Sequence, residues 1–374
     1  MTTPLGEKIK GLVRTTGPIS VAEYFALCLS DPQHGYYQTR EPFGSGGDFV
    51  TAPEISQIFG EMLGVFVVNA WQRHGSPALV RLVEIGPGRG TMMADMLRVI
   101  GRVAPALYDA ATLHLVETSA RLRQVQQATL SAHAAKISWH DDLAQVPDGF
   151  TLLSANELFD AIPIRQFVKT ADGFRERMIG LDDDGELAFT VGVAGLDTAL
   201  MPPTANSERH GAIFEAAPAR QAVMLSICER LMRFGGSAVM IDYGHMVSGF
   251  GDTLQAVYAH EYDPPLAHPG MADLTSHVDF ENLAATAAGA GVFVNGCIRQ
   301  GDFLVGLGIE ERAARLGRGK SLTAQQDIID AVERLAGAGV GRMGELFKVL
   351  AISGTPVQLE PFRPVTRPVS RPVA

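Results

Sequence analysis

The sequence predicts an α/β protein built around a mostly parallel β-sheet with helices on both faces. From residue 80 onward, short apolar runs alternate with segments of helical periodicity, which is the order of strand and crossover-helix units. The first apolar run, residues 80–85, ends in a glycine-rich turn that opens a helix. These two observations together give the fold class.

Four strands and two helices are expected in the first part of this region. Apolar residues at helical spacing follow the first strand until Pro105 breaks the pattern. Ser119 is placed to cap the helix after the second strand. The expected strands are residues 80–85, 113–116, 137–139 and 150–153, and the expected helices are residues 92–103 and 120–130.

The alternation of strand and helix segments ends after the fourth strand. Two turn dipeptides, Asp172-Gly173 and Asp184-Gly185, separate apolar segments and predict an inserted three-stranded meander. A helix that stops at Gly235-Gly236 leads to a further strand, residues 238–241, where the main sheet resumes. The last strand is expected at residues 347–352.

The length of 374 residues suits one enlarged domain or two. We expect an N-terminal helical or lid region at 1–79, a main domain at 80–352 and a tail at 353–374. The main domain would carry the β insertion at about 164–200 and a helical insertion at about 278–343. Residues 361–374 of this tail repeat Arg-Pro-Val and are expected to be extended and poorly packed. Residues 31–51 are either a lid or a surface loop held by aromatic packing.

Composition and charge exclude several classes of protein. Hydrophobic residues make up 46% of the chain and charged residues 19%, which is typical of a globular protein. The net charge of −10 makes nucleic acid and anionic lipid poor partners. The N-terminal region has no apolar segment long enough for a membrane span or signal core, so we expect a cytoplasmic protein. Three distant cysteines and scattered histidines predict neither disulfides nor a metal site.

The most informative motif is the turn after the first strand. Gly86, Gly88 and Gly90 allow the backbone to approach a ligand closely, and the helix start supplies unpaired N–H groups. A dinucleotide fingerprint would need its third glycine at position 91, which is Thr91. The Gly-x-Gly-x-Gly spacing therefore favours S-adenosylmethionine over NAD.

Carboxylates at the ends of three strands complete the predicted cofactor site. Glu84 is expected to receive the amino group of the ligand, and Glu117 to accept hydrogen bonds from both ribose hydroxyls. Asp141 and Asp142 follow the third strand. They either receive the adenine amino group or form an exposed acidic turn.

The fourth and fifth strands end in a second group of polar residues. Asn156, Glu157 and Asp160 close strand four beside the switch point, where open parallel sheets bind their substrates. They suit a cationic or amide acceptor, although a helix cap by Asn156 with solvated acids is the alternative. Asp242 and Tyr243 are candidates for the substrate wall, with a buried core tyrosine as the competing interpretation.

Other enzyme classes are disfavoured by the sequence. None of the seven tyrosines has Lys four positions later, as a short-chain dehydrogenase needs, and no Gly-x-Ser-x-Gly occurs, as in hydrolases. Gly319-Lys320-Ser321 imitates the end of a P-loop, but position 314 is alanine and no strand precedes it.

Six blocks of the sequence resemble, in order, the MidA-like family of class I S-adenosylmethionine-dependent methyltransferases. The resemblance runs from about residue 19 to residue 352. The blocks are GDFVTAPEIS at 47–56, EIGPGRG at 84–90, VETS at 116–119, NELFD at 156–160, IDYG at 241–244 and DLTSHVDF at 273–280. The first and last of them are distinctive of the family. The resemblance implies a Rossmann-like class I methyltransferase sheet with an inserted β-meander and extra helical regions.

Mitochondrial members of this family are complex I assembly factors that symmetrically dimethylate an arginine on a core subunit. The resemblance therefore implies a protein arginine N-methyltransferase that uses S-adenosyl-L-methionine and has a complex I core subunit or a similar protein as its partner. The implied cofactor residues are Gly86, Gly88, Gly90 and Glu117, covered by Gly47, Asp48 and Phe49. This chain has no evident targeting presequence, which suits a bacterial cytoplasm.

The hypothesis for the reaction is direct in-line displacement, with Glu157 pairing with the guanidinium and Asp160 nearby. Two other functions stay open. One is a noncatalytic complex I assembly chaperone that keeps the fold, and the other is a methyltransferase for a small molecule.

Overall fold

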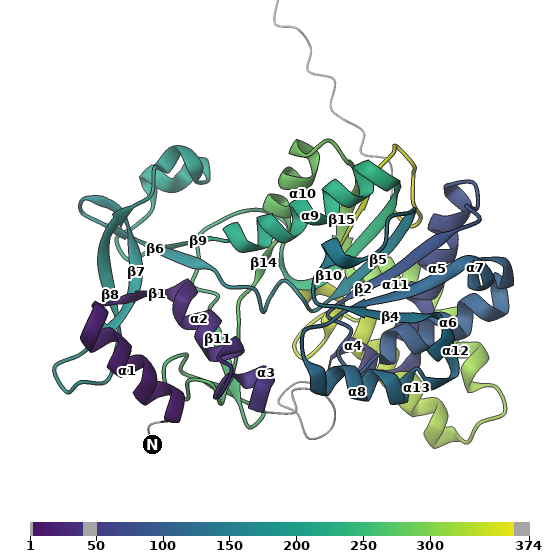
Figure 1. Cartoon of the computed structure of the whole chain (residues 1–374), viewed down its shortest axis with the longest axis horizontal. Coiled ribbons are helices and arrows are strands. Elements are labelled where there is room, and N and C mark those ends of the chain that lie inside the picture. Colours follow the sequence, from purple (N-terminus) through teal and green to yellow (C-terminus); the bar gives the residue numbers. More distant parts are fainter. Residues whose placement is uncertain (1–2, 40–50, 363–374) are drawn as a thin grey trace, which may run out of the picture.

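The computed structural model describes residues 3–39 and 51–362. Two units lie side by side in Figure 1: a large sheet covered by helices and a smaller sheet flanked by the N-terminal helices. None of the helices in these ranges is both long enough and apolar enough to cross a membrane.

The helices and strands have the following bounds. The α-helices are α1 (Pro4–Thr16), α2 (Val21–Ser30), α3 (Tyr36–Thr39), α4 (Ala52–Ile55), α5 (Gln57–Arg73), α6 (Thr91–Val103), α7 (Pro105–Ala110), α8 (Ala120–Thr129), α9 (Pro218–Phe234), α10 (Phe280–Gly289), α11 (Gln300–Gly306), α12 (Ile309–Gly317), α13 (Leu322–Ala336) and α14 (Met343–Leu346). The 3-10 helices are η1 (Ser131–Lys136), η2 (Leu143–Gln145), η3 (Thr198–Leu200) and η4 (Pro203–Ser207). The strands are β1 (Ile19–Ser20), β2 (Val80–Ile85), β3 (Ala111–Val116), β4 (Ile137–His140), β5 (Thr151–Asn156), β6 (Arg165–Thr170), β7 (Gly173–Leu181), β8 (Leu187–Gly195), β9 (Ile213–Ala216), β10 (Gly236–His245), β11 (Gln255–Tyr258), β12 (Glu261–Asp263), β13 (Asp273–Thr275), β14 (Val278–Asp279), β15 (Phe293–Arg299) and β16 (Phe347–Ser353).

The large sheet has the strand order β15-β16-β10-β5-β2-β3-β4, with β14 beside β10. The strands from β10 to β4 are parallel to one another. β16 runs antiparallel to both of its neighbours. The predicted α/β fold with a mostly parallel sheet is therefore confirmed.

The chain changes direction in this sheet between β2 and β5. From β2 it winds outward to β3 and β4, and then returns to the other side of β2 to form β5 and β10. Open α/β sheets bind ligands beyond the carboxyl ends of their strands at such a switch point. Gly86 and Glu157, which follow β2 and β5, therefore border the expected crevice.

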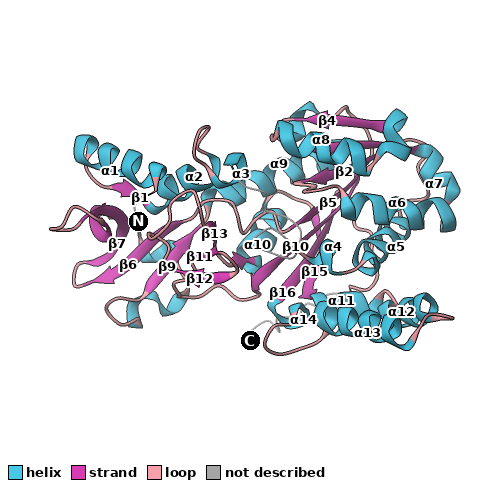
Figure 2. Cartoon of the chain, turned by 90° about the horizontal axis from the view of Figure 1, so that it is seen from below, coloured by secondary structure: helices cyan, strands magenta, loops and turns pink. Residues whose placement is uncertain are grey.

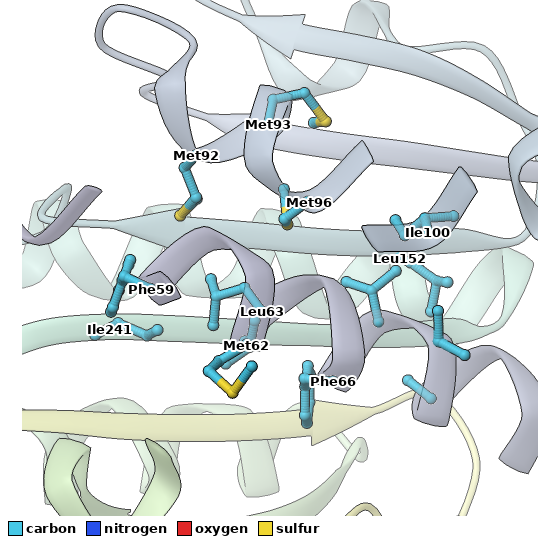
Figure 3. Packing of buried hydrophobic residues seen from close by; sticks show 14 of the residues in the cluster. Phe59, Met62, Leu63, Phe66, Met92, Met93, Met96, Ile100, Leu152 and Ile241 are labelled. Atoms are coloured by element: carbon cyan, nitrogen blue, oxygen red, sulfur yellow. The ribbon is translucent and has the colours of Figure 1, made fainter. Parts of the chain in front are cut away.

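Apolar side chains cover both faces of the parallel strands. Leu152 and Ile241 join the cluster that α5 and α6 form on one face, which Figure 3 shows from close by. The next residue of β5, Leu153, and Met240 of β10 join the cluster with α9 and α10 on the other face. Strands buried on both faces need nearly continuous apolar sequence, which explains the apolar run at residues 238–241.

The smaller unit contains a five-stranded sheet whose centre is the predicted meander β6-β7-β8. β1 from the N-terminal segment pairs with β7, and β9 pairs with β6, so this sheet extends beyond the expected insertion. α1, α2 and the small sheet β12-β11-β13 lie against it, as Figure 2 also shows. The first 79 residues are thus shared between the units, because α4 and α5 pack against α6 of the large one.

Two regions differ in part from the sequence-based expectation. The segment 278–343 is mainly helical, as expected, but it also contains β15, an edge strand of the large sheet with a bulge between Val294 and Gly296. The segment expected to be poorly packed, which starts at residue 361, begins with a buried residue, since Phe362 is 2% exposed. Leu359, just before this segment, is 0% exposed. The Phe362 ring packs against Phe66 of α5. Residues 363–374 lie outside the described ranges.

Candidate functional site

The turn after β2 has a backbone shape that favours glycine. Gly86, Gly88 and Gly90 have positive φ angles of 67°, 51° and 80°. α6 begins at Thr91, and its N-cap, Gly90, has no side chain with which to bond the first N–H groups of the helix. The turn therefore exposes backbone donors and leaves room for a ligand to approach them.

A narrow pocket of about 40 Å³ lies over this turn. Three parts of the chain meet in it: the segment around α4, the glycine turn with the start of α6, and the end of β5. The residues that line it are Thr51, Pro53, Glu54, Glu84, Gly86, Pro87, Gly88, Arg89, Thr91, Met92, Asn156 and Glu157.

Two buried acceptor atoms in this pocket have no hydrogen-bond partner among the described residues. They are Glu84 Oε2 and Asn156 Oδ1. Burial raises the pKa of Glu84 to about 8. Leaving a buried acceptor unpaired costs about 1–3 kcal/mol, so both atoms fit a ligand that brings hydrogen-bond donors. The ammonium group of S-adenosylmethionine is such a donor, and the residues present therefore fit this cofactor.

Glu117 follows β3 and lies next to the glycine turn. Ser119 N donates to its Oε1 at 2.8 Å. The Gln126 side-chain amide donates both to Glu117 Oε2, at 3.3 Å, and to the carbonyl of Gly88, at 2.8 Å. Burial raises the pKa of Glu117, although these hydrogen bonds act to lower it. A carboxylate oxygen accepts more than one hydrogen bond, so Glu117 can still bind ribose hydroxyls.

Asp141 and Asp142 face different partners. Asp141 is an exposed residue paired with Arg123 at 2.6 Å, and Arg123 also donates to the carbonyl of Glu117. Asp142 accepts a hydrogen bond from Ala144 N and caps η2. Neither carboxylate lines the pocket over the glycine turn. The structure therefore places both in an acidic turn at the edge of the site.

Glu157 enters the pocket from an unusual backbone conformation. Its φ is +50°, in the left-handed region that costs a residue with a side chain about 1–3 kcal/mol. Its Oε1 accepts hydrogen bonds from Ala52 N and from Asn156 Nδ2, both at 3.0 Å. Burial raises the pKa of Glu157 to about 7, and Asp160 adds to the increase. Asn156 and Glu157 thus share the pocket with Glu84, Gly86 and Gly88, whereas Gly90 and Glu117 do not line it.

Asp242, predicted as part of the substrate wall, lies in the interior of the protein. It is 0% exposed, and its carboxylate accepts the backbone N–H groups of Phe159, Asp160 and Tyr243. Because Asp242 is fully buried and does not line the pocket over the glycine turn, its carboxylate holds backbone and does not face a substrate. Asp160 and Tyr243, 7% and 6% exposed, bond each other through their side chains. Tyr243 therefore matches the competing interpretation, a buried core tyrosine whose hydroxyl is satisfied, and not the substrate wall.

Two residues near these groups were not found from the sequence alone. Glu54 of α4 lines the pocket and accepts a hydrogen bond from Thr91 Oγ1 at 2.6 Å. It belongs to the block 47–56, which could have indicated it. Arg220 of α9 contacts the turn after β5, but nothing in its helix distinguishes it. The other predicted members of the block, Gly47, Asp48 and Phe49, lie outside the described residues.

Fold and pocket together define the class of protein. The molecule is an S-adenosyl-L-methionine-dependent methyltransferase. A family model of this description matches residues 62–298, and the chain belongs to that family, the MidA-like methyltransferases. In residues 3–39 and 51–362, no group of three His, Cys, Asp or Glu side chains is arranged to hold a metal ion.

Known proteins resemble the chain over most of its length. It is 35% identical to the protein arginine methyltransferase NDUFAF7, mitochondrial, of Mus musculus, over 94% of this chain and 84% of the relative. The homolog of Caenorhabditis elegans is also 35% identical, over 91% of this chain and 84% of the relative. A crystal structure of a Burkholderia thailandensis protein bound to S-adenosyl-homocysteine matches with a TM-score of 0.80 at 29% identity, covering 95% and 93% of the two chains.

Proposed function

We propose that this chain transfers methyl groups from S-adenosyl-L-methionine to arginine side chains of a protein. The relatives named above are protein arginine methyltransferases, and they are similar over nearly the whole chain. The observation that carries the proposal is the position of Glu157, a half-buried carboxylate in the wall of the cofactor pocket. A guanidinium is the side chain that pairs best with a carboxylate in such a place.

The residues at the end of β5 would then orient the acceptor. When bound, S-adenosyl-L-methionine supplies a methyl group that needs no further activation. Ala52 N and Asn156 Nδ2 fix Glu157 Oε1, so this side chain holds the guanidinium without reorganising. The acceptor nitrogen loses a proton as it gains the methyl group. With a pKa of about 7, Glu157 can take that proton at neutral pH.

The acid groups behind Glu157 favour a cationic acceptor. Asp160 lies close enough to Glu157 to raise its pKa. Tyr37 of α3 faces the same region, since burial and the nearby carboxylates of Asp273 and Asp160 raise the pKa of its hydroxyl. Where these groups are ionised, their negative charge attracts a guanidinium and repels an anionic substrate.

The test compares the proteome of a strain that lacks the gene with that of its parent. Digestion and mass spectrometry should show a dimethyl-arginine that disappears on deletion and returns with the wild-type gene but not with Glu157→Gln. Unchanged dimethyl-arginine with failed complex I assembly would instead support a noncatalytic chaperone. A change confined to a small metabolite would support the third function.

We also propose a core subunit of respiratory complex I, or a similar protein, as the acceptor. Support comes from the family resemblance of the sequence blocks. The same experiment identifies the acceptor, because the modified peptide names the protein that carries it. A cytoplasmic site of action is part of this proposal.

A further inference from the structure

Arg220 is a buried arginine whose hydrogen bonds all point toward the acceptor side of the site. It lies in the first turn of α9 and is 2% exposed. Its guanidinium makes five hydrogen-bond contacts in the described part of the chain. Four acceptors are backbone carbonyls and the fifth is a hydroxyl: Ile162 O at 3.2 Å, Asp160 O at 3.2 Å, Ser276 O at 3.3 Å, His277 O at 2.6 Å and Ser276 Oγ at 2.6 Å.

These acceptors belong to two segments that are far apart in the sequence. One is the turn that follows β5, in the block 156–160, and the other connects β13 to β14, in the block 273–280. Apart from Arg220, Ser276 N donates to the Asp160 carbonyl at 3.2 Å. The planar guanidinium of Arg220, with its five N–H donors, therefore links the two blocks. A lysine ammonium, which is a point charge with three donors, would link them less completely.

The junction supports Glu157 through a short chain of contacts. Glu157 N donates to the Ile241 carbonyl at 2.9 Å, and Asp242 accepts the N–H groups of Phe159 and Asp160 at 2.9 and 3.1 Å. A residue held at φ of +50° persists only when its surroundings fix it. Arg220 holds the far end of this turn by the carbonyls of residues 160 and 162.

Electrostatic attraction to Asp242 and Asp160 also holds Arg220 near this turn. Burial lowers the pKa of Arg220, but the carboxylates of Asp242 and Asp160 act in the opposite direction. Arg220 and His277 also line a cavity of about 300 Å³ on the side of the smaller unit. Since that side is hollow, packing alone does not hold the turn in place there, and the hydrogen bonds of Arg220 matter more.

We propose that Arg220 is a positioning residue of the acceptor side, which sets the placement of Glu157 and Asp160 by joining the turn after β5 to the segment 273–280. This inference rests on the proposed function. It assigns no role in cofactor binding to Arg220, because Arg220 does not line the pocket over the glycine turn.

Arg230 provides a matched control on the same helix. It is 7% exposed, and its guanidinium also donates to backbone carbonyls, those of Val146 and Pro147, and to Thr151 Oγ1. These partners lie at the start of β5, at the opposite end of that strand from Glu157. Arg230→Lys therefore removes a similar buried fork from the fold without touching the acceptor side.

The experiment compares Arg220→Lys with Arg230→Lys in the full chain. Both variants should lower the melting temperature and keep the dissociation constant for S-adenosyl-homocysteine within about threefold of wild type. In the complemented deletion strain, at equal amounts of folded protein, Arg220→Lys should reduce the dimethyl-arginine at least tenfold, and Arg230→Lys less than twofold. Hydrogen exchange of the amides at 157–162 and 274–278 should become at least tenfold faster in Arg220→Lys alone, with residues 86–91 unchanged.

The proposal is overturned if both variants lose the modification equally, or if Arg220→Lys keeps it. It is also overturned if exchange in Arg220→Lys rises equally in the cofactor turn. If wild type itself produces no dimethyl-arginine, the proposed function fails, and the exchange pattern alone decides the positioning role. If Arg220→Lys does not fold, Ser276→Ala removes one acceptor of the fork and should change the same amides in the same direction.

Discussion

The two halves of the site differ in how their polar groups are satisfied. On the cofactor side, Glu84 Oε2 and Asn156 Oδ1 are buried without a partner among the described residues. On the acceptor side, Asp242 accepts three N–H groups and the Arg220 guanidinium makes five contacts. The first half is incomplete until a ligand supplies donors, whereas Asp242 and Arg220 in the second half are already bonded to backbone groups of the protein. The comparison separates residues that bind from residues that position.

The largest effect is expected at the glycine turn. Gly86→Val adds a side chain at a φ of +67°, with its Cβ 3.2 Å from Leu158 Cδ1. Calorimetry should show affinity for S-adenosyl-homocysteine reduced at least 100-fold, because backbone strain and the contact with Leu158 together deform the turn that holds the ligand. Gly75→Val is the control, since Gly75 also has positive φ but no atom lies within 4 Å of the added Cβ. Equal binding by wild type and Gly86→Val would contradict the assignment of the glycine turn to the cofactor side of the site.

The second largest effect is expected at Glu157, where the cofactor side of the site meets the acceptor side. Glu157→Gln keeps the size of the side chain but removes its charge and its capacity to take a proton. Methyl transfer should fall by a factor of about 100 or more, while affinity for S-adenosyl-homocysteine stays nearly unchanged. Turnover measured with radiolabelled cofactor on lysate proteins of the deletion strain decides this. Unchanged turnover removes Glu157 from the mechanism.

A tenfold effect of pH is expected from Glu84. Its pKa of about 8 means that the group is largely protonated at pH 7. A bound ammonium favours the ionised form and lowers this pKa, so affinity is greatest above pH 8 and falls as the pH decreases. Between pH 8 and pH 6, S-adenosyl-homocysteine should bind at least about tenfold more weakly to wild type. Glu84→Gln should abolish the dependence; a wild-type affinity independent of pH would contradict the assigned role.

The smallest effects distinguish the two acids near the sugar and base. Glu117→Gln should weaken cofactor binding about tenfold, because it removes charge-assisted hydrogen bonds in a half-buried place. Asp141→Asn should change it less than about threefold, since Asp141 is 66% exposed and exposed ion pairs contribute about 0–1 kcal/mol. The two titrations show which of these acids contacts the cofactor. A stronger effect at Asp141 would mean that the cofactor site includes the acidic turn.

Much of the fold was predictable because its signals are local. The first strand was predicted with the bounds of β2, and the helix after it to within one residue of α6, from one apolar run, three glycines and an amphipathic pattern. β15 was missed because its pairing with β16 decides its structure, while its own Asn295 and Gly296 weaken the strand pattern.

The acceptor side was less predictable, because tertiary contacts build it. Whether Asp242 or Tyr243 faces a cavity depends on strand alternation, where a shift of one residue exchanges the faces. Arg220 meets residues 160 and 276 only after three distant segments come together. Glu84 and Glu117, in contrast, adjoin the glycine turn or follow the next strand, so the strand order was enough to place them.

The most direct test of the account is a crystal structure of this chain with S-adenosyl-homocysteine. The predicted result places the amino group of the ligand within hydrogen-bond distance of Glu84 Oε2 or Asn156 Oδ1, and its ribose hydroxyls on Glu117. The sulfur would then face Glu157. A ligand bound elsewhere, with these oxygens still unpaired, would contradict the central claim that the turn at 86–90 holds the methyl donor.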